Sequence, residues 1–395
     1  MKNALNVPYV IVTKPIGAIC NLNCEYCFYL DKKKLYPDAK NFHMNIDTLE
    51  KYIKEYINQS AEEITFIWQG GEPTLLGITF FEKVLYFQGK YKGNKKILNT
   101  FQTNGILIND DWAAFLKEYN FLIGFSLDGP EFIQNKYRKY YDGRGSFKDV
   151  MKGLKVLQKH NVDYNILTCV NRFNAKYSKD VYTFLKNESG TIYFQFIPIV
   201  EKDSENTAAE YSVNALDYGD FLKQIFNKWV QRDIGKISVQ IFDVVFNIYA
   251  GLGPSLCIFQ ESCGYALALE HNGDVYSCDH FVSPDYLLGN INKSSIKEIV
   301  YSEKQRLFGD AKKKYLPDYC VQCPVKFLCN GGCPKNRFIR TPDGQNGLNY
   351  LCEGYKNFFS YVSPYMQFIA SEYKKGVHTS QVLKYIRAHR YQFDI

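Results

Sequence analysis

The feature of the sequence that most limits its fold is a strand-then-helix pattern, which recurs at intervals of roughly 30 to 40 residues up to about residue 200. Helices are predicted at 46–58, from 79 onwards, at 110–119 and at 147–160, the third capped by Asp110 or Asp111. Such alternation predicts an α/β fold with a parallel sheet and right-handed crossovers, as an open or closed barrel of six β/α units. The six predicted strands are 9–15, 63–69, 97–103, 122–128, 164–170 and 191–199.

Four of these strands are followed by polar or glycine-containing loops. In β/α barrels the loops at the carboxyl ends of the strands build the active site, so we expect the four loops to converge on one face. The alternative is that Gly, Asn, Asp and Pro only close turns here. The loops are "GAICNLNCEYCFYL" (17–30), "QGGEPTL" (69–75), "QTNG" (102–105) and "SLDGP" (126–130).

Composition limits the class of protein. A chain of 395 residues with 46% hydrophobic residues can bury one large core or two moderate ones. No apolar run approaches the roughly 18 residues of a membrane span, and the first residues lack the cleavage site of a signal peptide, so we expect a cytoplasmic protein. The net charge of +7 is mild and Lys and Glu are interspersed, which predicts no nucleic-acid partner.

Twelve cysteines without an export signal predict a reducing compartment, where thiols serve as metal or cluster ligands; disulfides are the minor alternative. Cys20, Cys24 and Cys27 lie within eight positions. Three thiolates on a four-iron cluster leave one iron without a protein ligand, and that iron can bind a small molecule. An open zinc site is the other explanation, but zinc usually brings histidine, and the loop contains none.

This loop resembles the signature of the radical S-adenosylmethionine (SAM) superfamily, C-x3-C-x2-C with an aromatic residue before the last cysteine, here Tyr26. The resemblance implies a partial (β/α)6 barrel, a [4Fe-4S] cluster whose open iron chelates SAM, and reductive cleavage of SAM to a 5'-deoxyadenosyl radical. From the residues alone, Arg138 is interpreted as a member of a surface ion pair and Val200 as an ordinary core residue. The residues that the resemblance implies bind SAM are Tyr26, Gly70, Gly71, Glu72, Ser126, Arg138 and Val200.

The second half of the chain carries eight further cysteines, enough to complete two cubane clusters. Their spacing resembles the SPASM extension of radical SAM enzymes, whereas two zinc sites are the alternative that spacing leaves open. Cys169 matches neither pattern and is interpreted as a small buried apolar residue. The resemblance implies one auxiliary [4Fe-4S] cluster on Cys257, Cys263, Cys278 and Cys333 and another on Cys320, Cys323, Cys329 and Cys352.

Over roughly residues 8–370 the chain resembles anaerobic sulfatase-maturating enzymes, in "CNLNCEYCFY", "WQGGEPTL", "GDVYSCDHF" and "GGCPKNR". The resemblance implies oxidation of a Cys or Ser of a sulfatase to Cα-formylglycine (3-oxoalanine), by hydrogen abstraction at Cβ. Asp279 matches the family's base, and a carboxylate beside a cluster is well placed to take a proton; a solvated turn residue is the alternative. Tyr29 and Gln69 are candidates for holding the substrate, and His280 is a weaker candidate for the base.

The same resemblance implies an unfolded or nascent sulfatase polypeptide as substrate and a reducing partner such as flavodoxin or ferredoxin. The predicted domains are a radical SAM barrel (1–240), a SPASM domain with the two auxiliary clusters (241–370) and a basic helical tail (371–395). Another SPASM enzyme, which forms thioether or carbon–carbon crosslinks in a peptide, is the alternative function. A zinc or ferredoxin-like module without enzymatic activity is a third.

Overall fold

The computed structural model describes residues 7–203, 205 and 207–388. Within them the chain forms two compact units, each described here by itself. In the described residues, no helix combines the length and apolar character that a membrane crossing requires. The first unit comprises residues 7–126, 134–164 and 263–310, and the second comprises 127–133, 165–262 and 311–388.

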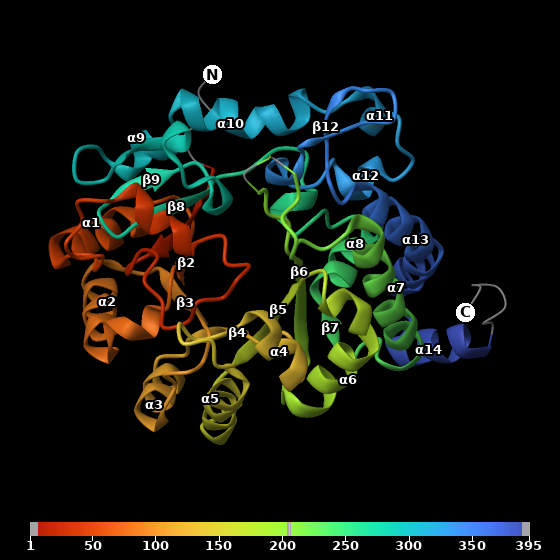
Figure 1. Cartoon of the computed structure of the whole chain (residues 1–395), viewed down its shortest axis with the longest axis horizontal. Helices are drawn as coiled ribbons and strands as arrows, with labels where there is room; N and C mark the ends of the chain where they lie inside the picture. The colour runs from red at the N-terminus through yellow and green to blue at the C-terminus, as the bar shows by residue number, and fades with distance from the viewer. Residues whose placement is uncertain (1–6, 204, 206, 389–395) are drawn as a thin grey trace. The chain divides into compact units, whose positions relative to one another are not determined.

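The sheet of the first unit has the strand order β10-β9-β8-β1-β2-β3-β4. Of these strands, Figure 1 labels β9, β8, β2, β3 and β4. The neighbouring pairs from β1 to β4 are parallel, as predicted, because helical crossovers connect them. Its strands are β1 (Val10–Lys14), β2 (Glu63–Trp68), β3 (Lys96–Thr103), β4 (Leu122–Ser126), β8 (Ala266–Glu270), β9 (Asp274–Tyr276) and β10 (Leu287–Asn290). Its helices are α1 (Ile46–Ile57), α2 (Ile78–Tyr91), α3 (Asp110–Glu118), α5 (Phe147–Lys159) and α9 (Ile296–Val300).

One predicted helix cap is wrong. Asn109, rather than Asp110 or Asp111, caps α3, and its side chain accepts from Trp112 N at 2.9 Å. Asn109 has the extended backbone that an N-cap needs, whereas Asp110 is already helical. The carboxylate of Asp110 instead contacts Lys159 Nζ at 2.7 Å.

The core of the first unit is unusually aromatic, because the inward positions of the strands and of α1 carry large rings. Phe66 and Trp68 alternate with half-buried residues along β2, and both are fully buried. Trp68 packs edge-on against Phe81 of α2 at 5.8 Å between ring centroids. Each such ring contributes about 2–3 kcal/mol through burial, and this rigid core fixes the ends of the strands.

A strand from the second half of the chain completes this sheet. β8 pairs with β1 in parallel, with Lys14 opposite Glu270, and β9 and β10 follow as antiparallel strands. The edge of β1 is therefore covered by a segment that lies some 250 residues further along the chain.

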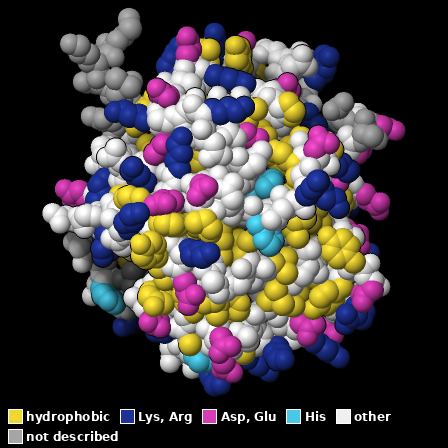
Figure 2. Space-filling view, turned by 90° about the vertical axis from the view of Figure 1, so that its left-hand side faces the viewer, with side chains coloured by type: hydrophobic (Ala, Val, Ile, Leu, Met, Phe, Trp, Pro, Cys, Tyr) yellow, Lys and Arg dark blue, Asp and Glu magenta, His cyan; other side chains and the backbone are white. Residues whose placement is uncertain are grey.

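On the face shown in Figure 2, Lys and Arg side chains are interspersed with Asp and Glu side chains.

The second unit contains a parallel sheet of β5, β6 and β7, covered by helices. The helices α7 (Ala215–Arg232) and α13 (Cys352–Lys374) cross at Gly219 and Gly354, where a Cβ on Gly354 would lie 1.8 Å from the carbonyl oxygen of Ala215. The strands are β5 (Tyr164–Val170), β6 (Tyr193–Pro198), β7 (Ser238–Val239), β11 (Ile339–Arg340) and β12 (Asn346–Leu348). The helices are α6 (Ser178–Glu188), α7 (Ala215–Arg232), α8 (Gln240–Ala250), α11 (Asp318–Val321), α12 (Lys326–Cys329), α13 (Cys352–Lys374) and α14 (Thr379–Ala388); α4 (Glu131–Tyr137) and α10 (Glu303–Lys314) have residues in both units.

The predicted tail begins inside a helix, because α13 continues to Lys374. α14 follows it, and residues 389–395 lie outside the described residues. The domain boundaries at 240 and 370 stay predictions.

Candidate active site

The cysteine loop, residues 17–30, follows β1 and forms backbone hydrogen bonds with two other segments of the first unit. Gly71 N donates to Gly17 O at 2.7 Å, and Glu72 N donates to Ile19 O at 2.8 Å. On its other side, the loop donates from residues 23 and 25 to the carbonyls of residues 139 and 137, at 2.8 and 3.1 Å. The backbone on both sides of Cys24 is therefore fixed.

The two glycines of "GGEP" are required at their positions for different structural reasons. Gly70 has φ +129°, a conformation that side chains disfavour. A Cβ on Gly71 would lie 1.8 Å from the carbonyl oxygen of Ile19, so no other residue fits there without displacing the cysteine loop. Their contribution to SAM binding stays a prediction; the close approach of the two loops is what the structure requires of them.

The carboxylate of Glu72 connects two of the predicted loops. It accepts from Thr74 N and Oγ1 at 3.1 and 2.7 Å, from Thr103 Oγ1 at 2.8 Å and from Asn104 N at 2.8 Å. Burial raises the pKa of Glu72, against the lowering effect of these donors. The predicted contact of Glu72 with the SAM ammonium stays a prediction, and its described contacts join "GGEP" to "QTNG".

The thiol of Cys20, a predicted cluster ligand, accepts two hydrogen bonds. Leu22 N and Asn104 Nδ2 donate to its sulfur at 3.4 and 3.7 Å, and such donors favour a thiolate and tune a cluster. Burial, followed by the nearby carboxylate of Glu72, raises the pKa of Cys20 to about 12. Burial also raises the pKa of Cys27. Iron binds cysteine as the thiolate, so cluster assembly on these thiols would displace protons.

Arg138 lies against the cysteine loop and is buried, which excludes the surface ion pair that the sequence left open. Its Nη1 donates to the hydroxyl of Tyr26 at 3.1 Å, and its charge acts to lower the pKa of Cys27. Ser126 is buried at the end of β4, which pairs with β3 beside "QTNG". Three predicted loops and Ser126 thus come together in one unit, which confirms the convergence for these segments.

Val200 belongs to the second unit, follows β6 and is 2% exposed. Its carbonyl accepts from Lys335 Nζ at 3.1 Å. Its predicted place at the adenine of SAM stays a prediction.

Asp279 begins a 3-10 helix, Asp279–Phe281, directly after Cys278. Its carboxylate forms an ion pair with the ammonium of Lys14. Lys14 Nζ also donates to Gln69 Oε1 at 2.6 Å, and Gln69 Nε2 in turn donates to Gln102. Asp279, the predicted base, and Gln69, a predicted substrate-holding residue, thus both contact the ammonium of Lys14.

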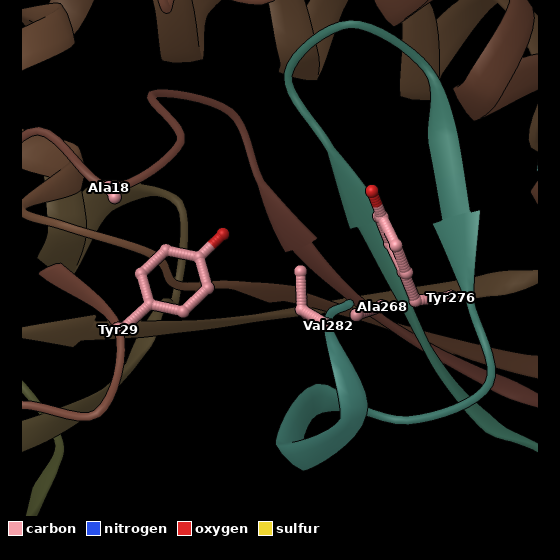
Figure 3. Packing of buried hydrophobic residues seen from close by; sticks show 5 residues of the cluster. All are labelled: Ala18, Tyr29, Ala268, Tyr276 and Val282. Atoms are coloured by element: carbon pink, nitrogen blue, oxygen red, sulfur yellow. The ribbon is translucent and has the colours of Figure 1, made fainter. Parts of the chain in front are cut away.

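Tyr29 is 2% exposed and packs in a small core of the first unit (Figure 3). Figure 3 shows that Tyr29 comes from the cysteine loop, whereas Ala268 and Tyr276 come from β8 and β9. The hydroxyl of Tyr29 donates to Glu270. Burial and the charge of Glu270 raise the pKa of Tyr29 well above its ordinary value. The ring of His280, the weaker candidate base, packs edge-on against Phe28 at 5.7 Å.

The second predicted auxiliary set lies within the second unit. Burial and the neighbouring Cys352 raise the pKa of Cys329 to about 12, and burial, Cys320 and Cys323 raise that of Cys352 to about 12. In the part of the chain that is described, no three His, Cys, Asp or Glu side chains lie close enough to hold one metal ion. A cavity whose walls carry four thiols suits the cube of a four-iron cluster. The cysteines that line this cavity are Cys320, Cys323, Cys329 and Cys352.

The turn 330–332 of "NGGCPKNR" positions Cys333, and all three of its residues have positive φ. Arg337 donates to the carbonyls of Gly331 and Asn330 at 3.0 and 2.9 Å. Asn349 Nδ2 donates to the carbonyls of Gly331 and Cys333, both at 3.2 Å. The arginine of this motif therefore maintains the shape of the turn.

The other predicted auxiliary set is divided between the units. In the first unit, Gln305 Nε2 donates to Gly264 O at 3.5 Å and to Ser277 O at 3.2 Å, which adjoin Cys263 and Cys278. In the second unit, Cys257 contributes to raising the pKa of Cys333, after burial. The assembly of all four thiols around one cluster stays a prediction. All twelve cysteines are free of disulfides, and Cys169 is half-buried rather than buried.

Gly354→Ala is expected to destabilise the second unit by about 1–3 kcal/mol, because the new methyl overlaps the backbone of α7. Gly354 lies two residues after Cys352, a predicted cluster ligand. After anaerobic reconstitution, the Gly354→Ala variant should therefore contain less iron than the wild type, by the amount that one cluster holds. Gly89→Ala is the matched control, because Gly89 is helical and its Cβ would meet nothing within 4 Å. Denaturant unfolding and iron analysis check both, and equal stability of the two variants contradicts the tight crossing.

Sequence reasoning missed three residues of the site: Lys14, Asn104 and Glu270. A lysine at the end of the apolar strand "YVIVTK" was a usable signal, because charges are rare in such strands. Asn104 lies in a loop that the sequence did single out. Glu270 gave no signal, because its position depends on the pairing of β8 with β1.

Comparisons with known proteins identify the families to which this chain is similar. The model of the radical SAM superfamily matches residues 15–185, and the SPASM model, an iron–sulfur cluster-binding domain, matches 257–324. The serine-type anaerobic sulfatase-maturating enzyme of Bacteroides thetaiotaomicron is 43% identical over 396 residues, which cover 96% of this chain and 95% of that enzyme. The cysteine-type enzyme of Clostridium novyi is 36% identical and covers 88% of this chain and 94% of that enzyme.

Solved structures are also similar. The structure of native anSMEcpe with bound AdoMet and the Cp18Cys peptide has a TM-score of 0.83 and 34% sequence identity. The match covers 93% of this chain and 99% of that chain. Together with the family models, it confirms the predicted fold class, a radical SAM α/β domain followed by a cysteine-rich SPASM domain.

Proposed function

Because this chain belongs to the family of anaerobic sulfatase-maturating enzymes, we propose that it oxidises a Cys or Ser residue of a sulfatase to Cα-formylglycine. The family's cofactors are SAM and [4Fe-4S] clusters, one in the radical SAM domain and two in the SPASM domain. The observation that carries the proposal is the grouping of Asp279, Gln69 and Tyr29 around Lys14, in the same unit as the cysteine loop. The crosslinking alternative is not favoured, since the named relatives are sulfatase-maturating enzymes.

Cys20, Cys24 and Cys27 would hold the catalytic cluster. SAM bound there would supply, on reduction, a 5'-deoxyadenosyl radical able to take a hydrogen atom from Cβ of the target residue. Asp279 would take the proton of the substrate thiol or hydroxyl, and the one electron that must also leave the substrate to give the thioaldehyde or aldehyde would pass to an auxiliary cluster. The eight SPASM cysteines would hold clusters whose chemistry is electron transfer.

The proposal includes the expected partners. The substrate is an unfolded or nascent sulfatase, because the target side chain must reach Asp279. The reductant is a small electron carrier such as flavodoxin or ferredoxin, and the location is the cytoplasm.

The test is anaerobic reconstitution with iron and sulfide, followed by incubation with SAM, a reductant and sulfatase-motif peptides that carry Cys or Ser at the target position. Mass spectrometry should show a product lighter by two hydrogens, or the aldehyde after hydrolysis of the thioaldehyde. A matched peptide with Ala at that position is the control and should stay unchanged.

A crosslink also removes two hydrogens, so the product is treated with a hydrazide, which captures aldehydes. Capture supports formylglycine formation. A product that resists the hydrazide and retains its mass supports the crosslinking alternative, and unchanged Cys and Ser peptides contradict the proposal.

A further inference from the structure

Lys14 is the last residue of β1 and is 1% exposed. Lysines are rarely buried to this extent unless their charge is compensated. Its neighbours along the strand include Ile11 and Thr13, both fully buried, so the ammonium lies at the end of a packed strand. The position is the strand end at which β/α domains place their active-site loops.

The ammonium contacts three side chains to which the proposed function assigns roles. It forms an ion pair with Asp279 Oδ1 and donates to Gln69 Oε1 at 2.6 Å. It also lies 4.5 Å from the ring centroid of Tyr29, in cation–π geometry. These residues come from three segments that are distant in sequence, namely the loop after β2, the cysteine loop and the turn after Cys278.

These contacts also fix orientations. Gln69 presents its oxygen to Lys14 and its amide nitrogen to Gln102, so its amide has one defined orientation. Tyr29 lies between the ammonium and Glu270, to which its hydroxyl donates. Glu270 in turn lies opposite Lys14 in the pairing of β8 with β1. The ammonium of Lys14 thus contacts Asp279, Gln69 and Tyr29 at the same time.

We propose that Lys14 is a positioning residue for the oxidation, which holds the Asp279 carboxylate, the Gln69 amide and the Tyr29 ring in one fixed arrangement. This inference rests on the proposed function. A base works only within about 2.6–3.2 Å of the proton that it takes. A displacement of about 1 Å costs about 100-fold in rate. Lys14 acts through Asp279 and the substrate contacts, not on the reacting atoms.

Replacing a lysine that only stabilises the fold and replacing one that positions catalytic groups are expected to change the reaction products differently. Loss of a structural residue lowers every activity together, through unfolding or loss of iron. Loss of a positioning residue separates SAM cleavage from substrate oxidation, because the radical still forms while the proton acceptor is misplaced.

The experiment uses the reconstituted full chain and measures formylglycine and 5'-deoxyadenosine in the same reaction. Lys14→Met should lower formylglycine about 100-fold and 5'-deoxyadenosine no more than about threefold, so that the ratio of the two falls sharply. Lys14→Arg, which keeps the charge, should recover part of this ratio. Lys96→Met is the matched control, because Lys96 also lies on a strand of this sheet but is exposed and pairs with Glu63.

Two further measurements do not depend on turnover. Binding of a fluorescent Cys-type peptide in the presence of SAM should weaken in Lys14→Met, because Gln69 and Tyr29 lose their common contact. In the Asp279→Asn background, Lys14→Met should weaken peptide binding but, at saturating peptide, should not lower the remaining formylglycine further, since the two residues act as a unit.

The outcomes separate the two proposals. If the wild type oxidises neither peptide, the proposed function fails. If the wild type is active but Lys14→Met keeps its ratio of formylglycine to 5'-deoxyadenosine, or if its effect adds fully to that of Asp279→Asn, the positioning role is overturned. Should Lys14→Met fail to retain iron, the ratio measured in Lys14→Arg decides: a ratio below that of the Lys96→Met control supports the role, and an equal ratio overturns it.

Discussion

Replacing Cys24 with alanine is expected to abolish cleavage of SAM, with a loss of at least about 1,000-fold, or about 4 kcal/mol in the activation barrier. Cys24 lies between Asn23 and Glu25, whose backbone N–H groups donate to the carbonyls of Lys139, just after α4, and of Tyr137, the last residue of α4. The loop therefore keeps its shape in the variant but has one ligand fewer, and a cluster held by two thiolates is not retained. The measurement is 5'-deoxyadenosine formation with reductant, together with iron content.

Cys169→Ala is the matched control for this prediction. Cys169 is half-buried in β5 and belongs to none of the three predicted ligand sets. The variant should keep its iron and cleave SAM at close to the wild-type rate. Full SAM cleavage by Cys24→Ala, or equal losses in the two variants, would contradict the assignment of the cysteine loop.

Asp279→Asn is expected to retain SAM cleavage and to lower formylglycine formation by roughly 100- to 10,000-fold, the usual contribution of a general base. The amide has nearly the shape of the carboxylate, and its oxygen can still contact the ammonium of Lys14, so the fold and the cluster should persist. What the variant lacks is a group that takes the proton of the substrate thiol or hydroxyl. Both products are quantified by mass spectrometry in one reaction.

Asp285→Asn provides the control, because Asp285 lies in the next 3-10 helix, Pro284–Tyr286, and is exposed. It should be as active as the wild type. If the Asp279→Asn variant forms formylglycine at the wild-type rate, Asp279 is not the base. If the variant loses SAM cleavage to the same extent as formylglycine formation, Asp279 has a structural role instead.

Much of the barrel could be predicted because its signals are local. Each of the six strands lies at a run of apolar and β-branched residues, and β5 coincides with its predicted range, 164–170. Local spacing also identified the cysteine motif, since three ligands in eight positions need no distant partner. The cap of α3 failed for an equally local reason: three neighbouring residues are all good caps, and only the backbone conformation selects Asn109.

The sequence by itself indicated the order of the six β/α units and the cysteine motifs, because helical periods, strand alternation and ligand spacing depend on neighbours in the chain. The candidate base, Asp279, came from the resemblance to the family and stays a prediction. Only the tertiary structure decided that β8 covers β1, that Lys14 meets Asp279 and Gln69, and that four cysteines line one cavity. The physical reason is that pairings between distant segments are selected by packing and by compensation of buried charge, which no local pattern records.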